Sequence, residues 1–237
     1  MSDTRSVLIT GAGRGLGYEL CHLYLRMGWV VFPVVRSEGA AERFDATLPR
    51  RCHPVVADLA SDDAIAAIRA SVSAHVIGLD LLVNNAGIPG VGAQLASVTT
   101  REIGDLVNVH CLGVVRCTQA VLPLLQARRG SKIVNVTSRV GSFARAAAGE
   151  FADDSLSYAY RIAKAAQNML TLCMSQELRP LGVMVCAVHP GEFRSGLNPE
   201  GDETPATVAK RFVDWLQDIG NGAAGRWHDP RVGTVPW

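Results

Sequence analysis

The sequence predicts an α/β fold in which helices cover both faces of a doubly wound parallel sheet. Short apolar segments alternate with longer amphipathic segments along most of the chain. The short segments are rich in Val and Ile and stay apolar at consecutive positions, as strands covered on both faces must. A glycine-rich turn, Gly11–Gly17, follows the first short segment and precedes an amphipathic one. This alternation is typical of right-handed β-α-β crossovers.

The short apolar runs are the expected strands: Val7–Thr10, Val30–Val35, His53–Ala57, Leu79–Asn84, Lys132–Thr137 and Met184–His189. The amphipathic runs are the expected helices, near Gly15–Met27, Asp62–Ala74, Arg101–Gln126, Tyr158–Leu178 and Thr204–Ile219. Two irregular stretches, Arg139–Ser157 and Arg194–Pro205, follow strands whose ends face the expected ligand crevice. We interpret them as lid or substrate-wall segments, with plain surface loops as the alternative.

Length and composition favour a compact globular protein. A chain of 237 residues can form one large α/β domain or two small ones. The absence of a linker or repeat in the sequence favours a single domain over residues 1–237. The sequence has 23 Lys and Arg against 22 Asp and Glu, and this balance gives no support to nucleic acid or an anionic membrane as the main partner.

The six cysteines are scattered and include no Cys-x-x-Cys pair. Buried free thiols are therefore favoured over a zinc site or a disulfide framework. The N-terminal residues lead directly into the first expected strand and leave no room for a signal peptide. No apolar run approaches membrane-spanning length. We expect a cytoplasmic protein without a membrane or a bound metal.

The glycine-rich turn has the residue types of a phosphate-binding loop. Gly11, Gly13, Gly15 and Gly17 alternate between the first strand and the first helix. Glycine allows close backbone approach to a pyrophosphate, and the helix N-terminus offers free N–H donors. The spacing differs from Gly-x-Gly-x-x-Gly. A dinucleotide site is the favoured interpretation, and a glycine turn without a ligand is the alternative.

The end of the second strand indicates which dinucleotide is bound. An NAD-selective crevice carries an acidic residue there, which bonds the ribose 2′-hydroxyl. Here Val35 and Arg36 occupy that end, and Arg14 lies in the glycine turn. Two guanidinium groups without a carboxylate suit a 2′-phosphate. The sequence therefore predicts NADP(H) in preference to NAD(H), although solvated surface arginines would give the same pattern.

Tyr160 and Lys164 have the spacing of an acid/base pair. Positions i and i+4 share one helix face, so the phenol and the ammonium can converge. A nearby cation favours the phenolate and makes tyrosine a usable acid/base closer to neutral pH. Such a pair is common on surface helices. Combined with a phosphate-binding loop, it indicates hydride chemistry on a carbonyl or an alcohol.

A set of motifs in a fixed order resembles one enzyme family. The motifs are Thr10–Gly17, Asp58-Leu59, Asn84–Gly87, Ser138, Tyr160 with Lys164, and His189–Gly191. Together they resemble the short-chain dehydrogenases/reductases over nearly the whole chain. The resemblance implies a Rossmann-type sheet of about seven strands. Within the family the chain is most similar to carbonyl-reductase-like members related to C-factor and Sniffer proteins. That similarity rests on Thr118–Leu125, Tyr158–Arg161 and Val235–Trp237.

The resemblance also implies a role for individual residues along the cofactor. It assigns the pyrophosphate to the glycine turn, the adenine to Asp58 and Leu59, the adenosine ribose to the Asn-Ala-Gly turn, and the nicotinamide to the residues after the last strand. The implied cofactor-binding residues are Gly11, Arg14, Gly15, Leu16, Gly17, Arg36, Asp58, Leu59, Asn85, Ala86, Gly87, Tyr160, Lys164, Pro190, Gly191, Phe193 and Ser195.

The same resemblance implies the catalytic residues. Ser138 orients the substrate oxygen, Tyr160 exchanges the proton, and Lys164 lowers the pKa of the phenol and binds the nicotinamide ribose. The family's fourth catalytic residue is an asparagine, but an ungapped count places His110 there. An imidazole can anchor a relay water beside Lys164 and titrates near neutrality. A local bulge that brings Asn108 into the site, or a core role for His110, remains an alternative.

These expectations converge on an oxidoreductase that acts on a small, largely apolar carbonyl or alcohol substrate. The segment between Ser138 and Tyr160 is longer than in the family, so it is expected to shape the substrate pocket. It is also expected to alter the helix-pair interface through which a homodimer would form. The alternatives are a relative that uses bound nucleotide for epimerisation or dehydration, and a catalytically weakened nucleotide-binding regulatory or scaffold protein.

Overall fold

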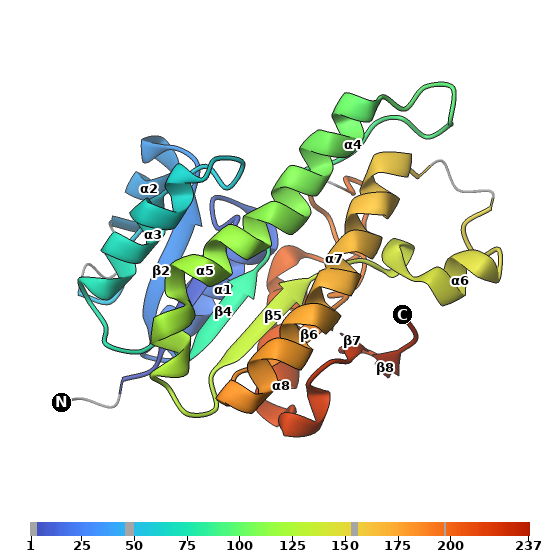
Figure 1. The fold of residues 1–237 in the computed structure, drawn as a ribbon. Coiled ribbons are helices and arrows are strands. Elements are labelled where there is room, and N and C mark those ends of the chain that lie inside the picture. Colours follow the sequence, from blue (N-terminus) through green and yellow to red (C-terminus); the bar gives the residue numbers. More distant parts are fainter. Residues whose placement is uncertain (1–3, 46–49, 153–155, 197) are drawn as a thin grey trace.

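The computed structural model describes residues 4–45, 50–152, 156–196 and 198–237, which build one eight-stranded sheet (Figure 1). The order is β3-β2-β1-β4-β5-β6-β7-β8; each pairing up to β7 is parallel, and β8 joins antiparallel. The strands are β1 Ser6–Thr10, β2 Val30–Val35, β3 Val55–Val56, β4 Leu81–Asn84, β5 Lys132–Val136, β6 Met184–Val188, β7 Trp227–Asp229 and β8 Gly233–Val235.

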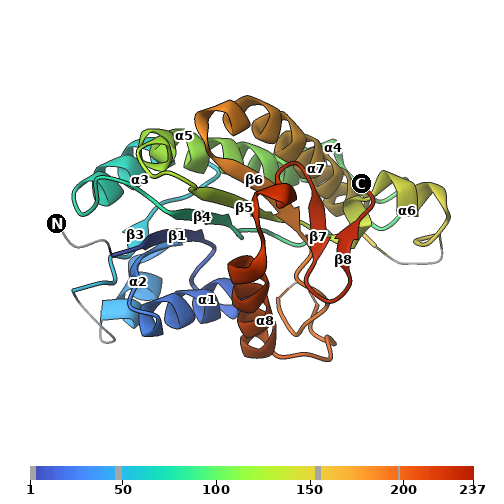
Figure 2. The same ribbon diagram turned by 90° about the horizontal axis from the view of Figure 1, so that it is seen from below.

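Helices cover both faces of this sheet (Figure 2). Those of one face are α1, α2 and α8, and those of the other face are α3, α5 and α7. Their bounds are α1 Gly15–Arg26, α2 Glu38–Asp45, α3 Asp63–Ser73, α4 Thr100–Val107, α5 Gly113–Gln126, α6 Phe143–Ala147, α7 Tyr158–Leu178 and α8 Pro205–Asp218. The predicted doubly wound α/β fold is therefore confirmed.

The two layers of helices explain why the strands are apolar at consecutive positions. In β1, Val7 and Ile9 pack in the cluster beneath α1 and α8, whereas Leu8 packs in the cluster beneath α3, α5 and α7. All three side chains are fully buried. Successive residues of a strand point to opposite faces, so a strand covered on both faces needs apolar residues at every position.

The strand order reverses between β1 and β4, and this reversal creates the crevice. β2 and β3 lie on one side of β1, and β4 and the later strands lie on the other. A doubly wound sheet leaves an open space outside the carboxyl ends of the strands at such a point. Gly11 and Asn85, which follow these two strands, both line a cavity there.

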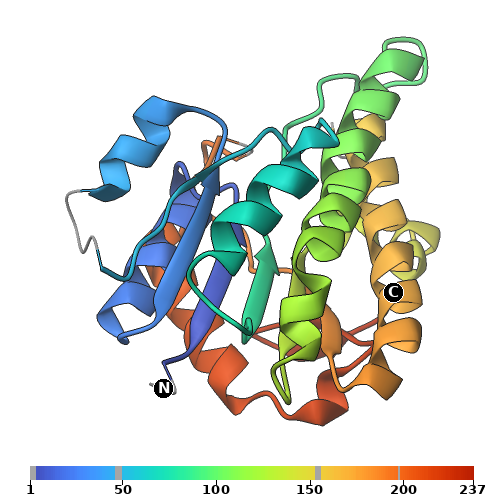
Figure 3. The same cartoon turned by 60° about the vertical axis from the view of Figure 1, so that its left-hand side comes forward.

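The helix expected at residues 101–126 contains a π-helical turn. The chain runs from α4 through Asn108–Leu112, which has π geometry, into α5 without a break. Figure 3 shows α4 and α5 as one long rod beside α7. By length and composition the segment Thr100–Gln126 could cross a membrane, contrary to the expectation from the sequence, but half of its most apolar window is buried in the fold.

Several short elements were missed or misjudged in the sequence. α2, α6, β7 and β8 were not expected, and the third strand is shorter than predicted. The expected lid stretch holds a 3-10 turn at Arg139–Gly141 followed by α6, and its Asp153-Asp154 pair lies outside the described residues. Short elements carry too few residues for a periodic pattern, so tertiary contacts decide them. All six cysteines are free, and five of them are buried as expected, whereas Cys173 is exposed.

We expect Phe212→Ala to destabilise the fold strongly. Phe212 lies on α8, is fully buried and packs in the cluster shared with α1. Truncation leaves a cavity that the surrounding helices fill only in part, at a cost of about 3–5 kcal/mol. Urea denaturation measures the loss, with Ile77→Ala as the control because Ile77 is 76% exposed. Equal effects of the two substitutions would contradict this account of the core.

Candidate active site

The glycine turn brings the backbone against the neighbouring strand end. Gly11 and Gly15 have φ angles of +66° and +60°, which L-residues with side chains rarely adopt. A Cβ on Gly11 would lie 2.7 Å from the Ala86 Cα, and one on Gly17 would lie 2.6 Å from the Gly11 carbonyl oxygen. Gly13 shows neither constraint, since its Cβ would meet nothing closer than 3.6 Å.

Thr10 ties this turn to the segment after β4. Its Oγ1 accepts hydrogen bonds from the backbone N–H groups of Asn85 and Ala86, both at 3.0 Å. The Asn85 side chain returns a bond from Nδ2 to the Thr10 carbonyl oxygen at 2.9 Å. The two loops at the point of strand reversal are thereby held as one unit.

A cavity of about 690 Å³ runs along this unit. The N-terminus of α1 opens beside it without a side-chain cap or an acidic residue in its first turn. Its backbone N–H groups are therefore suited to an anionic ligand. The expected cofactor residues that line the cavity are Gly11, Arg14, Gly15, Leu16, Arg36, Asp58, Leu59, Asn85, Ala86, Gly87, Phe193 and Ser195. Gly17 is buried behind the turn instead.

The outer end of this cavity is cationic. Arg14 and Arg36 are both exposed and line it. The Arg14 guanidinium lies against the loop after β6, since a Cβ on Gly196 would be 2.8 Å from its Nη2. Arg43 donates to the Gly13 carbonyl oxygen at 2.9 Å. Among the described residues that line the cavity, Asp58 is the only acid.

A second cavity of about 500 Å³ continues the first and shares Leu16, Asn85, Gly87 and Phe193 with it. Ser138, Tyr160, Lys164, Pro190 and Gly191 line this second cavity. The Ser138 hydroxyl is hydrogen-bonded to the Tyr160 phenol. The Lys164 Nζ lies 5.6 Å from the centre of the Tyr160 ring. The structure therefore brings the three side chains together in the second cavity of one continuous crevice.

Burial determines the protonation states of Tyr160 and Lys164. It raises the pKa of Tyr160 to about 12, against the opposing effect of the Ser138 hydrogen bond. It also lowers the pKa of Lys164 to about 7. The expectation that Lys164 lowers the phenol's pKa stays a prediction, and burial is the larger effect in this arrangement. Loss of water disfavours the charged form of both groups, and a half-protonated amine attracts a phenolate weakly.

The structure places His110, and not Asn108, beside the tyrosine. The His110 ring meets the Tyr160 ring edge to face, with centroids 5.4 Å apart. Asn108 points to the other side, where its Nδ2 donates to the Ala60 carbonyl oxygen and its Oδ1 accepts from Arg116. The π-helical turn is present, but it does not bring Asn108 into the crevice.

His110 is fully buried and holds the segment after Gly87. Its Nε2 lies 3.0 Å from the carbonyl oxygen and 3.2 Å from the amide nitrogen of Ile88. A Cβ on Gly87 would come within 2.6 Å of the imidazole Cε1, so glycine makes room for the ring. Burial, with the charge of Lys164, lowers the pKa of His110 to about 3. The expectation that this histidine titrates near neutrality is therefore wrong.

Glu102, which was not singled out in the sequence, anchors the start of α7. Its carboxylate accepts from the backbone N–H groups of Val91 at 2.6 Å and Gly92 at 3.1 Å, and from the Ser157 hydroxyl at 3.3 Å. Ser157 in turn caps α7 by accepting from the Tyr160 N–H. The pattern Thr99-x-x-Glu102 is a capping-box signature and was the available signal.

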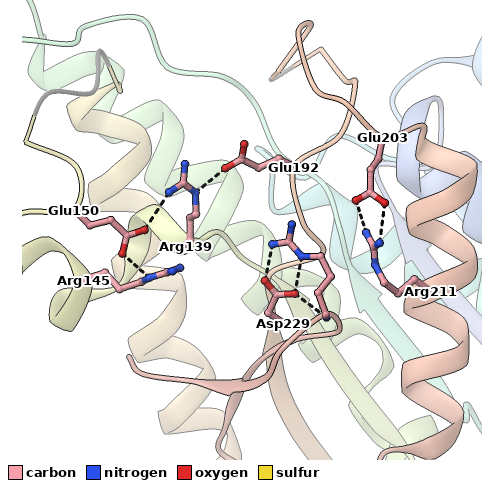
Figure 4. A network of polar contacts seen from close by, with 8 residues as sticks. Arg139, Arg145, Glu150, Glu192, Glu203, Arg211 and Asp229 are labelled. Atoms are coloured by element: carbon pink, nitrogen blue, oxygen red, sulfur yellow. Dashed lines mark hydrogen bonds and ion pairs between the residues drawn. The ribbon is translucent and has the colours of Figure 1, made fainter.

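Sequence reasoning also missed a set of ion pairs around the second cavity (Figure 4). Arg139, directly after Ser138, pairs with Glu192 at 2.7 Å and with Glu150 at 3.1 Å. These contacts join the turn after β5 to the loop after β6. The neighbouring pairs are Arg145 with Glu150, Arg231 with Asp229, and Arg211 with Glu203. Arg139 and Glu192 lie 53 positions apart in the sequence, so no local pattern connects them.

We expect Gly11→Ala to disrupt the crevice. The alanine would have to adopt a positive φ, and its methyl group would collide with the Ala86 backbone, which is hydrogen-bonded to Thr10. Folding stability and dinucleotide affinity should both fall, as measured by thermal unfolding and by fluorescence titration. Gly39→Ala is the control, because a Cβ there meets nothing within 4 Å. A Gly11→Ala protein with wild-type stability and affinity would refute the steric account.

Comparison with known proteins agrees with this geometry. Residues 5–206 match the family model for short chain dehydrogenases. C-signal of Myxococcus xanthus is 32% identical over 160 residues, which are 67% of this chain and 93% of that protein. The crystal structure of NADPH-bound carbonyl reductase from chicken fatty liver superposes with a TM-score of 0.89 at 25% identity, covering 99% of both chains. Carbonyl reductase Sniffer of D. melanogaster superposes with a TM-score of 0.88 at 26% identity, covering 99% of this chain and 100% of that one. The chain belongs to the short-chain dehydrogenase/reductase family of oxidoreductases.

Proposed function

We propose that the protein is an NADP(H)-dependent oxidoreductase that transfers a hydride between the nicotinamide and a carbonyl or alcohol group of a small, largely apolar substrate. The observation that carries this proposal is the meeting of Ser138, Tyr160 and Lys164 in a cavity continuous with the glycine turn. Apolar side chains of Val140, Leu156 and Phe193 line the same cavity, and its volume of about 500 Å³ suits a small substrate.

The residues present fit a dinucleotide. Gly11 and Gly17 allow the turn to pack so closely that a Cβ at either position would collide with Ala86 or Gly11, and the uncapped N-terminus of α1 lies beside the cavity. The pyrophosphate would lie against these N–H groups. Asp58 and Leu59 would hold the adenine, and Pro190 and the neighbouring residues would border the nicotinamide. When bound, the reduced nicotinamide would supply the hydride.

The proposed chemistry uses the three side chains in distinct roles. The Ser138 hydroxyl orients the substrate oxygen toward the phenol. In reduction, Tyr160 gives its proton to the oxygen as negative charge develops there, and it takes the proton back in oxidation. Its phenol stays protonated at neutral pH, because burial raises its pKa to about 12, so it is ready as an acid. Protonated Lys164 stabilises the phenolate left behind and binds the nicotinamide ribose.

His110 is proposed to assist proton delivery as a neutral imidazole. Its Nε2 is engaged with Ile88, while its buried Nδ1 has no hydrogen-bond partner among the described residues. A buried polar atom of this kind is commonly satisfied by an internal water. Such a water beside Tyr160 and Lys164 would connect them to solvent.

The alternative is a catalytically weakened nucleotide-binding regulatory or scaffold protein. The presence of His110 in place of the family's asparagine is the observation that favours it. The intact Ser138, Tyr160 and Lys164 set favours an enzyme. We also propose a homodimer, supported by exposed Ile162 and Met169 on α7 and Leu112 beside it, and a cytoplasmic location, supported by six free cysteines.

Tyr160→Phe should reduce turnover about 10²–10⁴-fold, because it removes only the proton donor. NADPH affinity should stay close to that of the wild type. Assays of NADPH oxidation with ketones, aldehydes and quinones provide the measurement. Tyr158→Phe is the matched control, since Tyr158 lies one half-turn away on α7 and is partly exposed. Near-wild-type turnover in Tyr160→Phe would rule out the assignment.

Arg36→Ala should weaken NADPH binding about ten- to a hundredfold, which is the loss of one charge-assisted contact with phosphate. NADH binding should change little, because NADH has no 2′-phosphate. Fluorescence titration with both cofactors measures this difference. Arg179→Ala is the control, since Arg179 is exposed at the opposite end of the strands, just before β6. Equal wild-type affinities for NADPH and NADH would contradict the proposed preference.

A further inference from the structure

A set of buried polar side chains lies beneath Lys164. The Lys164 Nζ donates to the Val136 carbonyl oxygen and to the Gln167 Oε1, both at 2.9 Å. Gln167 is fully buried, one turn farther along α7. The carbonyl oxygen of Gln167 accepts from the Thr171 hydroxyl at 2.8 Å, and Thr171 accepts from the Asn135 Nδ2 at 2.9 Å. Gln167 is thus linked to both α7 and β5.

These hydrogen bonds limit the number of N–H donors that Lys164 can offer to the crevice. A lysine ammonium has three N–H donors, and two of them are engaged by Val136 and Gln167. One donor remains for Tyr160 or for a ligand in the crevice. Because Val136 contributes a backbone oxygen on a rigid strand, Gln167 is the side chain that determines where the ammonium stays.

We propose that Gln167 is a positioning residue of this site, whose amide oxygen holds the Lys164 ammonium so that its third N–H faces the crevice. This role rests on the proposed function, in which that N–H serves the nicotinamide ribose and the phenolate. Gln167 lies outside the cavity lining and acts only through the lysine. It would not touch substrate or cofactor.

The choice of an amide suits a lysine that changes its protonation state. The titratable groups that face Lys164 are Tyr160 on the same helix and His110 and Cys111 on the π-helical turn, while β5 contributes the Val136 carbonyl. The Gln167 Nε2 has no partner among the described residues. After half a rotation the amide would offer this N–H to a neutral amine, whereas the oxygen suits the ammonium.

The effect on protonation has a defined sign. Burial lowers the pKa of Lys164 to about 7. A hydrogen bond to the charged form opposes this shift, so removing the Gln167 oxygen should lower the pKa further. Replacing the amide by a carboxylate should raise it, because an opposite charge then favours the ammonium. One such hydrogen bond to a charged group is expected to shift the pKa of Lys164 by about one unit.

The test uses the small number of lysines in the chain. Lys132, Lys164 and Lys210 are the three lysines of the sequence, so protein labelled with ¹⁵N at the lysine Nζ gives a simple NMR spectrum. Titration of the Lys164 signal is compared in wild type, Gln167→Met and Gln167→Glu. Methionine keeps the length without the acceptor, and glutamate keeps the shape with a charge. Asn168→Leu is the matched control, because Asn168 is also buried on α7 but bonds to Gly141.

We expect the Lys164 midpoint to fall by about one pH unit in Gln167→Met and to rise by a similar amount in Gln167→Glu. The control should titrate as the wild type does. Midpoints equal to wild type in both Gln167 variants, or an equal shift in the control, would overturn the proposal. Should Gln167→Met fail to fold, the isosteric Gln167→Glu still decides the question.

The pH dependence of kcat provides a second test of the role of Gln167. The alkaline limb of the kcat profile should move to lower pH in Gln167→Met and to higher pH in Gln167→Glu, because the protonated lysine supports the phenolate. If the wild-type protein reduces no carbonyl compound with NADPH, the proposed function fails. The NMR titration would still test Gln167 independently, since it needs neither cofactor nor turnover.

Discussion

The bond between Thr10 and the segment after β4 is the contact on which the rest of the site depends. At the point of strand reversal, two neighbouring parallel strands end side by side and their loops diverge. One threonine hydroxyl accepts from two successive backbone N–H groups of the opposite loop. This brings Ala86 so close to Gly11 that no side chain fits between them. The need for glycine in the turn and the position of the crevice floor follow from this close approach.

The end of the crevice that holds Tyr160 and Lys164 depends on a different constraint, the exclusion of water. Tyr160, Lys164 and His110 are each largely buried, and desolvation is the first cause of the pKa shift of every one of them. Burial favours neutral forms, so the phenol and the imidazole are uncharged at neutral pH and the lysine is balanced between two states. The side chain that offers the lysine an acceptor, Gln167, therefore has an influence it would not have in water.

Among the described residues that line the second cavity, the charged ones besides Lys164 are Arg139 and Glu192, which pair with each other. Arg139 lies directly after Ser138 and is paired with carboxylates from two other segments. Exposed ion pairs of this kind contribute little to stability. The pair of Arg139 with Glu192 instead connects the turn after β5 to the loop after β6, and both segments line the second cavity. Glu102 also connects two segments of the site, because it joins the loop after Gly87 to the residue that caps α7, Ser157.

The sequence by itself determined the doubly wound fold. Strands covered on both faces are short and apolar at every position, helices covered on one face are amphipathic, and the two kinds of segment alternate along the chain. The sequence also predicted that the glycine turn, Tyr160 and Lys164 would serve one site, since i,i+4 spacing and a strand–turn–helix context are local. The ungapped count indicated His110 at this site, but only the tertiary structure excluded Asn108, because a π-helical turn changes the angle between residues without changing the sequence pattern. Tertiary structure also decided the protonation of the buried groups and the contact of Lys164 with Gln167, since burial and hydrogen-bond partners depend on packing between distant segments.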